Sequence, residues 1–121
     1  MPEVIVKTTP GLIPDLVMKH SFADTMQGVV AEVLSVPGTQ AELHRNEVEV
    51  DFQEFSPFAM RNGIDCAITV TANLYPERDG KADEYAKRIM KLLSQKFYVH
   101  VLGVYHVWIL LAQGGFRDSR S

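Results

Sequence analysis

The feature that most constrains the fold is a switch between two hydrophobic periods, which occurs twice along the chain. Apolar and polar residues alternate without exception from Val48 to Gln53, as in a strand with one face exposed to water. Elsewhere apolar residues recur every three or four positions, as in a helix that packs on one side. The periods predict strands over residues 2–7, 48–53, 64–74 and 104–112, and helices over residues 14–35 and 82–97. Asp79 is the expected N-cap of the second helix.

The strand–helix–strand order predicts a single α+β domain over residues 1–121, built from a doubled β-α-β unit. Crossovers between parallel strands are nearly always right-handed, so both helices should pack on one face of a four-stranded mixed sheet. The chain has 46% hydrophobic and 22% charged residues, which is enough apolar material for a core without disulfides. The last strand is apolar on both sides. One side carries Val104, Trp108 and Leu110, and the other carries Tyr105, Val107, Ile109 and Leu111. Since one of these two rows would stay uncovered in a monomer, we expect self-association through the open sheet face.

Charge and cysteine content exclude several classes of protein. The net charge is -3 and basic residues are scattered, so no basic footprint for nucleic acid is present. Cys66 is the single cysteine and lies in an apolar alternating stretch, which fits a reducing compartment and a core position. No leader pattern and no apolar run of membrane-spanning length occurs. We expect a soluble, cytoplasmic protein.

Pro2 follows the initiator Met1 and opens the first predicted strand. Removal of Met1 would leave a secondary amine, and amino-terminal amines have a reference pKa of about 7.7–8.0. Desolvation or a nearby cation could bring such an amine close to the operating pH, where proton transfer is most effective. Retention of Met1 would instead block the nitrogen as an amide.

Together these features resemble the tautomerase superfamily, which includes 4-oxalocrotonate tautomerase and macrophage migration inhibitory factor. The resemblance covers residues 2–116 and is carried by the Met-Pro start, the doubled β-α-β unit, Pro57-Phe58 and Cys66-Ala67-Ile68. It implies a homotrimer with the amino-terminal proline in a pocket at a subunit boundary. It also implies Pro2 as the catalytic residue, acting as a general base on 2-keto acids or their enols, or as a general acid in relatives that hydrate or decarboxylate small acids.

The resemblance further implies substrate-binding residues, each with an ordinary structural alternative. Arg78 is the expected carboxylate clamp, because guanidinium offers a bidentate fork, but it could equally be a solvated turn residue. Arg61 is a second candidate cation, Phe58 a candidate apolar wall beside the proline, and Trp108 a candidate lining residue or simply a buried tryptophan. Small relatives place an arginine where this chain has Glu49, a departure that argues against a dicarboxylate substrate.

No cofactor is expected. The four histidines form no helical i, i+4 pair and have no cysteine companion, which argues against a metal site. The favoured hypothesis is a cofactor-independent tautomerase or isomerase of small 2-keto acids. Three alternatives stay open: a hydratase or decarboxylase that uses the same proline, a tautomerase-like binding or oligomerisation module without turnover, and a ferredoxin-like sensor of small molecules with the same element order.

Overall fold

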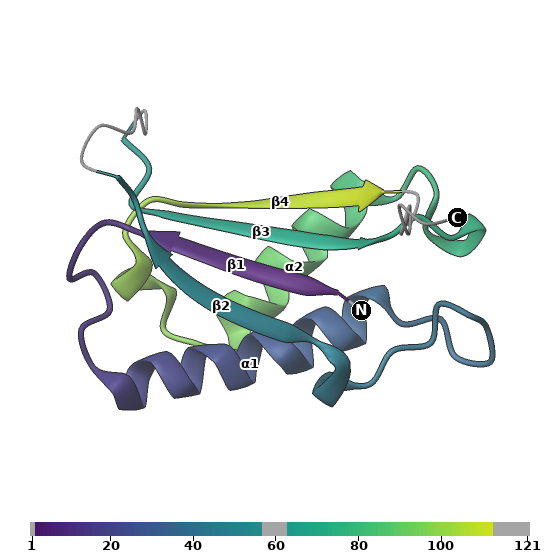
Figure 1. The fold of residues 1–121 in the computed structure, drawn as a ribbon, viewed down its shortest axis with the longest axis horizontal. Coiled ribbons are helices and arrows are strands. Elements are labelled where there is room, and N and C mark those ends of the chain that lie inside the picture. Colours follow the sequence, from purple (N-terminus) through teal and green to yellow (C-terminus); the bar gives the residue numbers. More distant parts are fainter. Residues whose placement is uncertain (1, 57–62, 113–121) are drawn as a thin grey trace, which may run out of the picture.

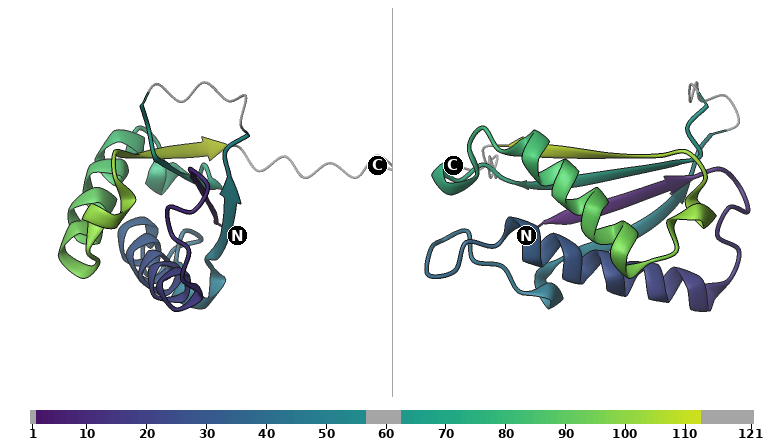
Figure 2. Two further views of the ribbon diagram at one scale, coloured as in Figure 1. Left: turned by 90° about the vertical axis from the view of Figure 1, so that its left-hand side faces the viewer. Right: turned by 180° about the vertical axis from the view of Figure 1, so that it is seen from behind.

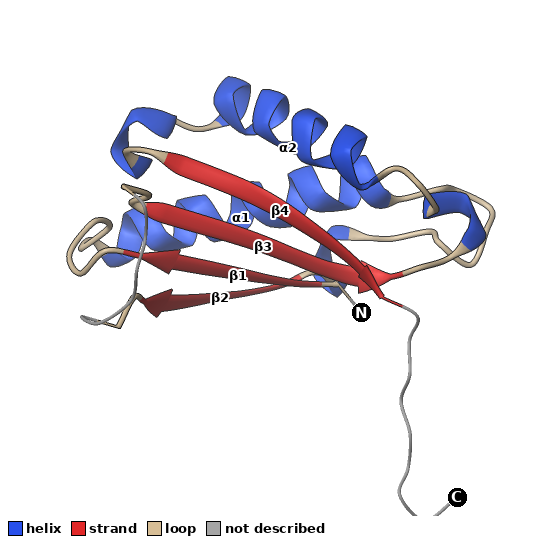
Figure 3. Ribbon diagram, turned by 90° about the horizontal axis from the view of Figure 1, so that it is seen from above, coloured by secondary structure: helices blue, strands red, loops and turns tan. Residues whose placement is uncertain are grey.

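A computed structural model describes residues 2–56 and 63–112, and it has two layers (Figure 1). One layer is a four-stranded sheet and the other consists of two helices on a single face of that sheet, as the view from above shows (Figure 3). The strands are β1 (Glu3–Thr8), β2 (Glu49–Glu54), β3 (Cys66–Asn73) and β4 (Tyr105–Ala112), and the helices are α1 (Leu16–Leu34) and α2 (Ala82–Lys96). Three short 3-10 turns complete the described elements: η1 (Arg45–Glu47), η2 (Pro76–Arg78) and η3 (Val99–Leu102). The predicted fold class is confirmed.

The strand order β2-β1-β3-β4 reflects the doubled β-α-β unit. β1 pairs in parallel with β2, and β3 pairs in parallel with β4, so each half keeps the direction that a crossover helix requires. The halves join where β1 and β3 run antiparallel, with Val4 opposite Val70. The sheet is therefore mixed, and its centre is the contact between the two halves.

The hydrophobic core lies between the sheet and the helices, which form two layers when the molecule is seen from its end (Figure 2, left). Alternate residues of β1 and β3 point into the core, as the geometry of a strand with one buried face requires. Cys66 is fully buried there, as expected. The largest fully buried side chains are Val4, Val6, Phe22, Met26, Val29, Val30, Leu34, Val48, Ile68, Ile89, Leu93 and Leu102.

The two helices are capped differently at their starts, and the cap predicted for the second helix is wrong. α1 begins after Asp15, whose carboxylate accepts a hydrogen bond from the Val17 N–H at 2.9 Å. Asp79 is not the N-cap of α2. It ends η2, and the N-cap of α2 is Lys81, whose side chain makes no capping bond. The extra turn around Arg78 moves the start of the helix beyond the first residue with a good capping side chain.

The sheet face opposite the helices is open and has two halves of different character. On β4, Trp108 is 44% exposed and Leu110 is 55% exposed, while Ile109 between them is half-buried. On the half of this face that β1 and β2 form, Glu3 of β1 lies beside Glu49 of β2. The uncovered apolar row expected from the sequence is therefore present in the single chain. None of the helices in the described residues is long and apolar enough to span a membrane.

A tight turn fixes the entry to β4. Gly103 has φ +61°, a conformation that other residues rarely adopt, and a side chain there would meet the carboxylate of Asp65. That carboxylate accepts a hydrogen bond from the Val104 N–H at 2.9 Å. The main chains of Asp65 and Val104 are bonded as well, so the start of β4 is tied directly to the start of β3.

Candidate functional site

Pro2 is buried at the amino end of β1. It continues the alternation of Val4 and Val6, the β1 residues in the core. Its carbonyl accepts a hydrogen bond from the Glu49 N–H at 3.1 Å, which extends the β1–β2 ladder by one bond. The ring of Pro2 is thus fixed at a strand end.

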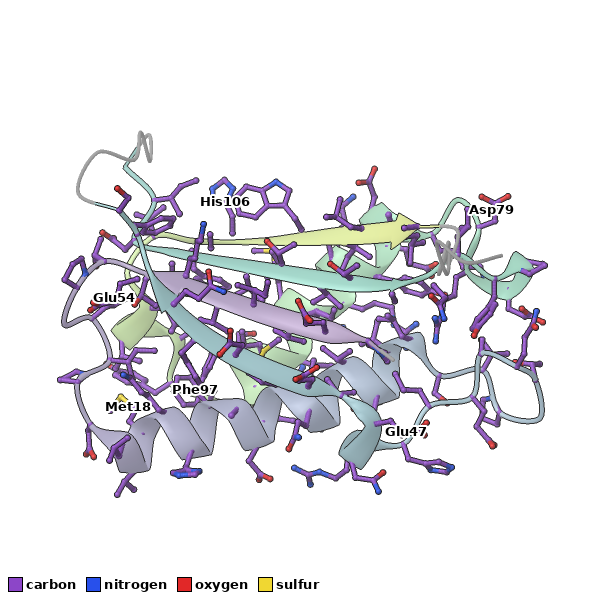
Figure 4. All side chains as sticks on the ribbon, viewed as in Figure 1. Met18, Glu47, Glu54, Asp79, Phe97 and His106 are labelled. Atoms are coloured by element: carbon purple, nitrogen blue, oxygen red, sulfur yellow. The ribbon has the colours of Figure 1, made fainter. Side chains whose placement is uncertain are left out.

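A small pocket of about 90 Å³ adjoins Pro2. It is formed by both halves of the molecule: the first half supplies Pro2, the connection after α1 and η1, and the second half supplies the end of β3 and η2. Figure 4 shows two labelled residues of this region, Glu47 and Asp79, at the end of the molecule where β1 begins, with His106 at the opposite end. The lining residues are Pro2, Gln40, Glu42, Leu43, Glu47, Asn73, Tyr75 and Arg78.

Arg78 is the one cation in this lining, and it is almost completely buried, with 3% of its surface exposed. Its guanidinium donates to three main-chain carbonyls: Nε to Leu34 at 3.3 Å, Nη1 to Asn73 at 3.1 Å and Nη2 to Ala41 at 3.2 Å. Among the described residues no carboxylate forms an ion pair with it. Since a guanidinium has five N–H donors, two are left without an acceptor in the described part of the chain.

Burial is the main influence on the pKa of the Arg78 guanidinium. Desolvation lowers the pKa of the guanidinium, and the nearby Tyr85, Tyr75 and Glu77 act in the opposite sense. Arginine still keeps its proton in proteins, so the pocket has a permanent, poorly solvated positive charge. Such a charge attracts an anion strongly, because little water screens it.

Tyr75 and Asn73 are held in the same turn as Arg78. The Arg78 N–H donates to the Tyr75 carbonyl at 2.8 Å, and the Tyr75 ring lies 5.2 Å from the guanidinium carbon, a cation–π distance. The Nδ2 of Asn73 donates to the Tyr75 hydroxyl at 3.1 Å. The neutral polar side of the pocket is therefore built from one short, internally bonded segment.

Two acids complete the lining. Glu47 accepts a hydrogen bond from the His44 N–H at 2.9 Å, and Glu42 accepts a long one from the Gly38 N–H at 3.4 Å. Both belong to the connection between α1 and β2. The pocket thus combines one buried cation with two carboxylates nearer to solvent.

The structure brings together two of the five residues predicted from the sequence. Pro2 and Arg78 line the same pocket. Trp108 does not line it, because the strand alternation places this side chain on the open sheet face. Phe58 and Arg61 lie outside the described residues.

Glu49, the residue that departs from the arginine of small relatives, is exposed and does not line the Pro2 pocket. Within residues 2–56 and 63–112 no three His, Cys, Asp or Glu side chains are grouped as a metal site would require.

Besides the apolar Leu43, the sequence analysis missed five polar or aromatic residues of the lining: Gln40, Glu42, Glu47, Asn73 and Tyr75. A signal for two of them was available. Asn73 lies at the end of the third predicted strand and Tyr75 directly follows that strand, where the antiparallel first strand begins with Pro2. The others come from an irregular connection whose path the sequence pattern does not fix.

Comparison with known proteins gives matches at the level of structure alone. No family model matches the sequence, and no curated protein matches it. Among solved structures, the macrophage migration inhibitory factor-like protein of Entamoeba histolytica has a TM-score of 0.61 and 15% identity, over 97% of this chain and 93% of that chain. A fused 4-OT, an asymmetric trimer, has a TM-score of 0.58 and 16% identity, over 98% of this chain and 94% of that chain.

The protein Pt0534, in a form inactivated by 2-oxo-3-pentynoate, has a TM-score of 0.58 and 14% identity, over 97% of this chain and 92% of that chain. All three likenesses extend over nearly the whole of both chains, and all are at low identity. They show a shared fold, and the chemistry of this chain has to be argued from its own residues.

Proposed function

Since the chain has the fold of the tautomerase superfamily, we propose that it is a cofactor-independent tautomerase of small 2-keto acids with Pro2 as its general base. Loss of Met1 frees the ring nitrogen, and the buried position of Pro2 favours the neutral amine over its protonated form. Arg78 holds the substrate carboxylate through its two uncommitted N–H groups. The enzyme needs no metal for this reaction.

The proton that Pro2 removes from the substrate is returned to it within the same site. The Pro2 nitrogen takes a proton from the carbon next to the keto group, and the electrons of that C–H bond form a C=C bond as the carbonyl electrons move to oxygen. The protonated amine then returns the proton to the enolate, at the same carbon or at another carbon of a conjugated frame. A bound carboxylate keeps the substrate carbon near the base, which replaces a bimolecular encounter by an intramolecular one.

One observation carries the proposal: Pro2 and Arg78 line a single pocket although they come from different halves of the fold. The pocket volume of about 90 Å³ is that of about three water molecules, which suits a compact acid better than an extended one. Glu42 and Glu47 add negative charge to the lining and disfavour a further carboxylate beyond the keto group of the substrate. A small monocarboxylic 2-keto acid fits the pairing of base and cation, the pocket volume and the negative charge of the lining.

The assembly that we propose is a homotrimer packed through the open sheet face. The support is the exposed apolar row of β4, and a fused 4-OT trimer with the same fold. An uncovered row that includes a tryptophan and a leucine is costly to leave in water. In this arrangement the face opposite the helices becomes part of a second core.

The proposal is tested by α-proton exchange of 2-keto acids in D₂O, followed by NMR. Wild-type protein, with the loss of Met1 verified by intact mass, should exchange the α-protons of small monocarboxylic acids, and Pro2→Ala should lose nearly all of this exchange. Arg78→Lys should raise KM, and Arg88→Lys on the exposed side of α2 is the matched control. Exchange that survives in Pro2→Ala would refute the base assignment.

Two further measurements separate the alternatives. A base must be neutral, so exchange should rise with pH and then level off, whereas a hydratase or decarboxylase that uses protonated Pro2 would lose activity over the same range. 2-Oxo-3-pentynoate, which inactivates Pt0534, should modify the Pro2 nitrogen in equimolar amount. Binding of small acids without exchange or labelling would favour the module without turnover.

A further inference from the structure

Enolate formation places negative charge on the former keto oxygen, and the proposed reaction needs a donor at that position. Arg78 is committed to the main chain and to the carboxylate, and the two acids in the lining are acceptors when ionised. The remaining side-chain donors in the lining are Gln40, Asn73 and Tyr75. The donor should therefore come from these three neutral groups.

The geometry favours Tyr75. Its hydroxyl already accepts a hydrogen bond from Asn73 Nδ2 at 3.1 Å, so one oxygen lone pair is occupied and the hydroxyl proton is directed to a different acceptor. No described residue accepts a hydrogen bond from the Tyr75 hydroxyl, and a hydroxyl that accepts one hydrogen bond donates a stronger one. Asn73 uses its amide nitrogen on the tyrosine, while Gln40 is exposed on an irregular connection.

Tyr75 is also held firmly by its neighbours. The ring lies against the Arg78 guanidinium, the Tyr75 N–H donates to the Asn73 carbonyl at 3.1 Å, and the Tyr75 carbonyl accepts from the Arg78 N–H. The neighbouring Leu74 N–H donates to the Ala112 carbonyl at 2.8 Å, which ties the turn to the end of β4. A donor fixed in advance of the reaction stabilises developing charge without reorganising.

We propose that Tyr75 donates the hydrogen bond that stabilises the enolate oxygen of the substrate, with Asn73 as the residue that positions its hydroxyl. The inference rests on the proposed function. During the reaction the α-proton moves to the Pro2 nitrogen, the carbonyl electron pair moves to oxygen, and the phenol proton stays on Tyr75 while it bonds to that oxygen. The same bond breaks or weakens when the carbonyl is restored.

The first experiment compares Tyr75→Phe with wild type in α-proton exchange of pyruvate. The variant keeps the ring on Arg78 and removes only the hydroxyl, so kcat should fall by about 10²-fold with little change in KM. Asn73→Ala should give a smaller fall in kcat. Tyr98→Phe, at a tyrosine that is 69% exposed and does not line the pocket, is the matched control.

The second experiment uses oxalate, a planar dianion that resembles the enolate of pyruvate, and propionate, which has a carboxylate alone. Tyr75→Phe should weaken oxalate binding by about tenfold, the loss expected of one charge-assisted hydrogen bond, and leave propionate binding unchanged. Calorimetry measures both without turnover. Wild-type protein that binds oxalate but exchanges no proton would overturn the proposed function while leaving the Tyr75 contact measurable.

Tyr75→Phe with wild-type kcat and wild-type oxalate binding would overturn the inference. Loss of kcat in Gln40→Leu, with none in Tyr75→Phe, would overturn it as well and assign the donor to the connection after α1. Urea unfolding of each variant identifies a general loss of structure, because such a loss would move propionate binding and the unfolding midpoint together.

Discussion

The Arg78 guanidinium donates to the carbonyl of Ala41 at 3.2 Å across the boundary between the two β-α-β halves. The same side chain reaches the carbonyl of Leu34 at the end of α1. Both acceptors belong to the first half of the chain, while Arg78 follows β3 in the second half. The residue that we propose as the anion clamp is thus also a connector between the halves, and its two roles can be measured separately.

Replacing Arg78 with methionine should destabilise the fold by about 2–5 kcal/mol, because the change leaves buried carbonyls without donors. Urea unfolding measures the loss. Arg88→Met, at an exposed position on α2, should change the unfolding free energy by less than about 0.5 kcal/mol. Equal stability of the two variants would contradict the connecting role. Arg78→Lys keeps a charge and one flexible set of donors, so its unfolding free energy should lie between those of wild type and Arg78→Met.

The stability of the fold should decrease at high pH through Cys66. Burial, and to a smaller extent Asp65, raises the pKa of this thiol from its ordinary 9.0 to about 12. The folded state therefore holds the thiol proton more tightly than the unfolded state does. The stabilisation is complete below about pH 9 and is lost as the pH rises through the folded pKa, with a slope of at most about 1.4 kcal/mol per pH unit.

The measurement for Cys66 is the unfolding free energy between pH 8 and about pH 11, in wild type and in Cys66→Ala. The alanine variant lacks the thiol and should show a shallower fall with pH. Tyr85, whose pKa burial also raises, acts in both proteins and cancels in the comparison. Burial is the main cause of the raised pKa of Tyr105 and Cys66 adds to it, so a change at Tyr105 counts as part of the effect of the thiol. Parallel pH profiles would show that the thiol makes no such contribution.

Gly103→Ala should cost more stability than Gly80→Ala, although both glycines have positive φ. A side-chain carbon at Gly103 would clash with an Asp65 carboxylate oxygen, whereas one at Gly80 would meet nothing within 4 Å. Gly103 also has ψ −138°, a backbone conformation that is nearly restricted to glycine, so strain and clash add at this position. Thermal or urea unfolding measures the difference in cost. In an Asp65→Ala background the carboxylate is absent, so the extra cost of Gly103→Ala should become smaller, and an undiminished difference would contradict the clash.

Leu110→Glu should break the proposed trimer. The substitution places a charge in the apolar row of β4, which the assembly would cover, and a buried unpaired charge is strongly unfavourable. Light scattering should give a monomer mass for the variant and a trimer mass for wild type. Lys87→Glu, on the exposed side of α2, should remain trimeric. A monomer mass for wild-type protein would refute the trimer without reference to any variant.

The fold was predictable because local pattern and tertiary burial agree. The alternation in the first and third strands sets which residues enter the core, and the observed β1 and β3 follow it. The strand and helix bounds differ from the predicted ones by a few residues. Asp79 was misassigned because the sequence shows a capping residue but not the 3-10 turn that ends there.

The site was predictable only in part, for geometric reasons. Pro2 could be named because removal of Met1 would make it the amino-terminal residue, and Arg78 could be named as a cation near a helix start. That Arg78 is buried depends on carbonyls at Leu34 and Ala41, and backbone acceptors have no sequence signature. Trp108 was a candidate by residue type, yet its strand position puts it on the sheet face away from the Pro2 pocket.

The position of Pro2 inside the pocket has a practical consequence for anyone who produces this protein. An affinity tag or fusion partner at the amino end would extend the chain beside this pocket, and it would turn the ring nitrogen that we propose as the base into part of a peptide link. Under the proposed function such a preparation should stay chemically silent, so it can serve as an inert reference for material released by a protease that cuts directly before the proline.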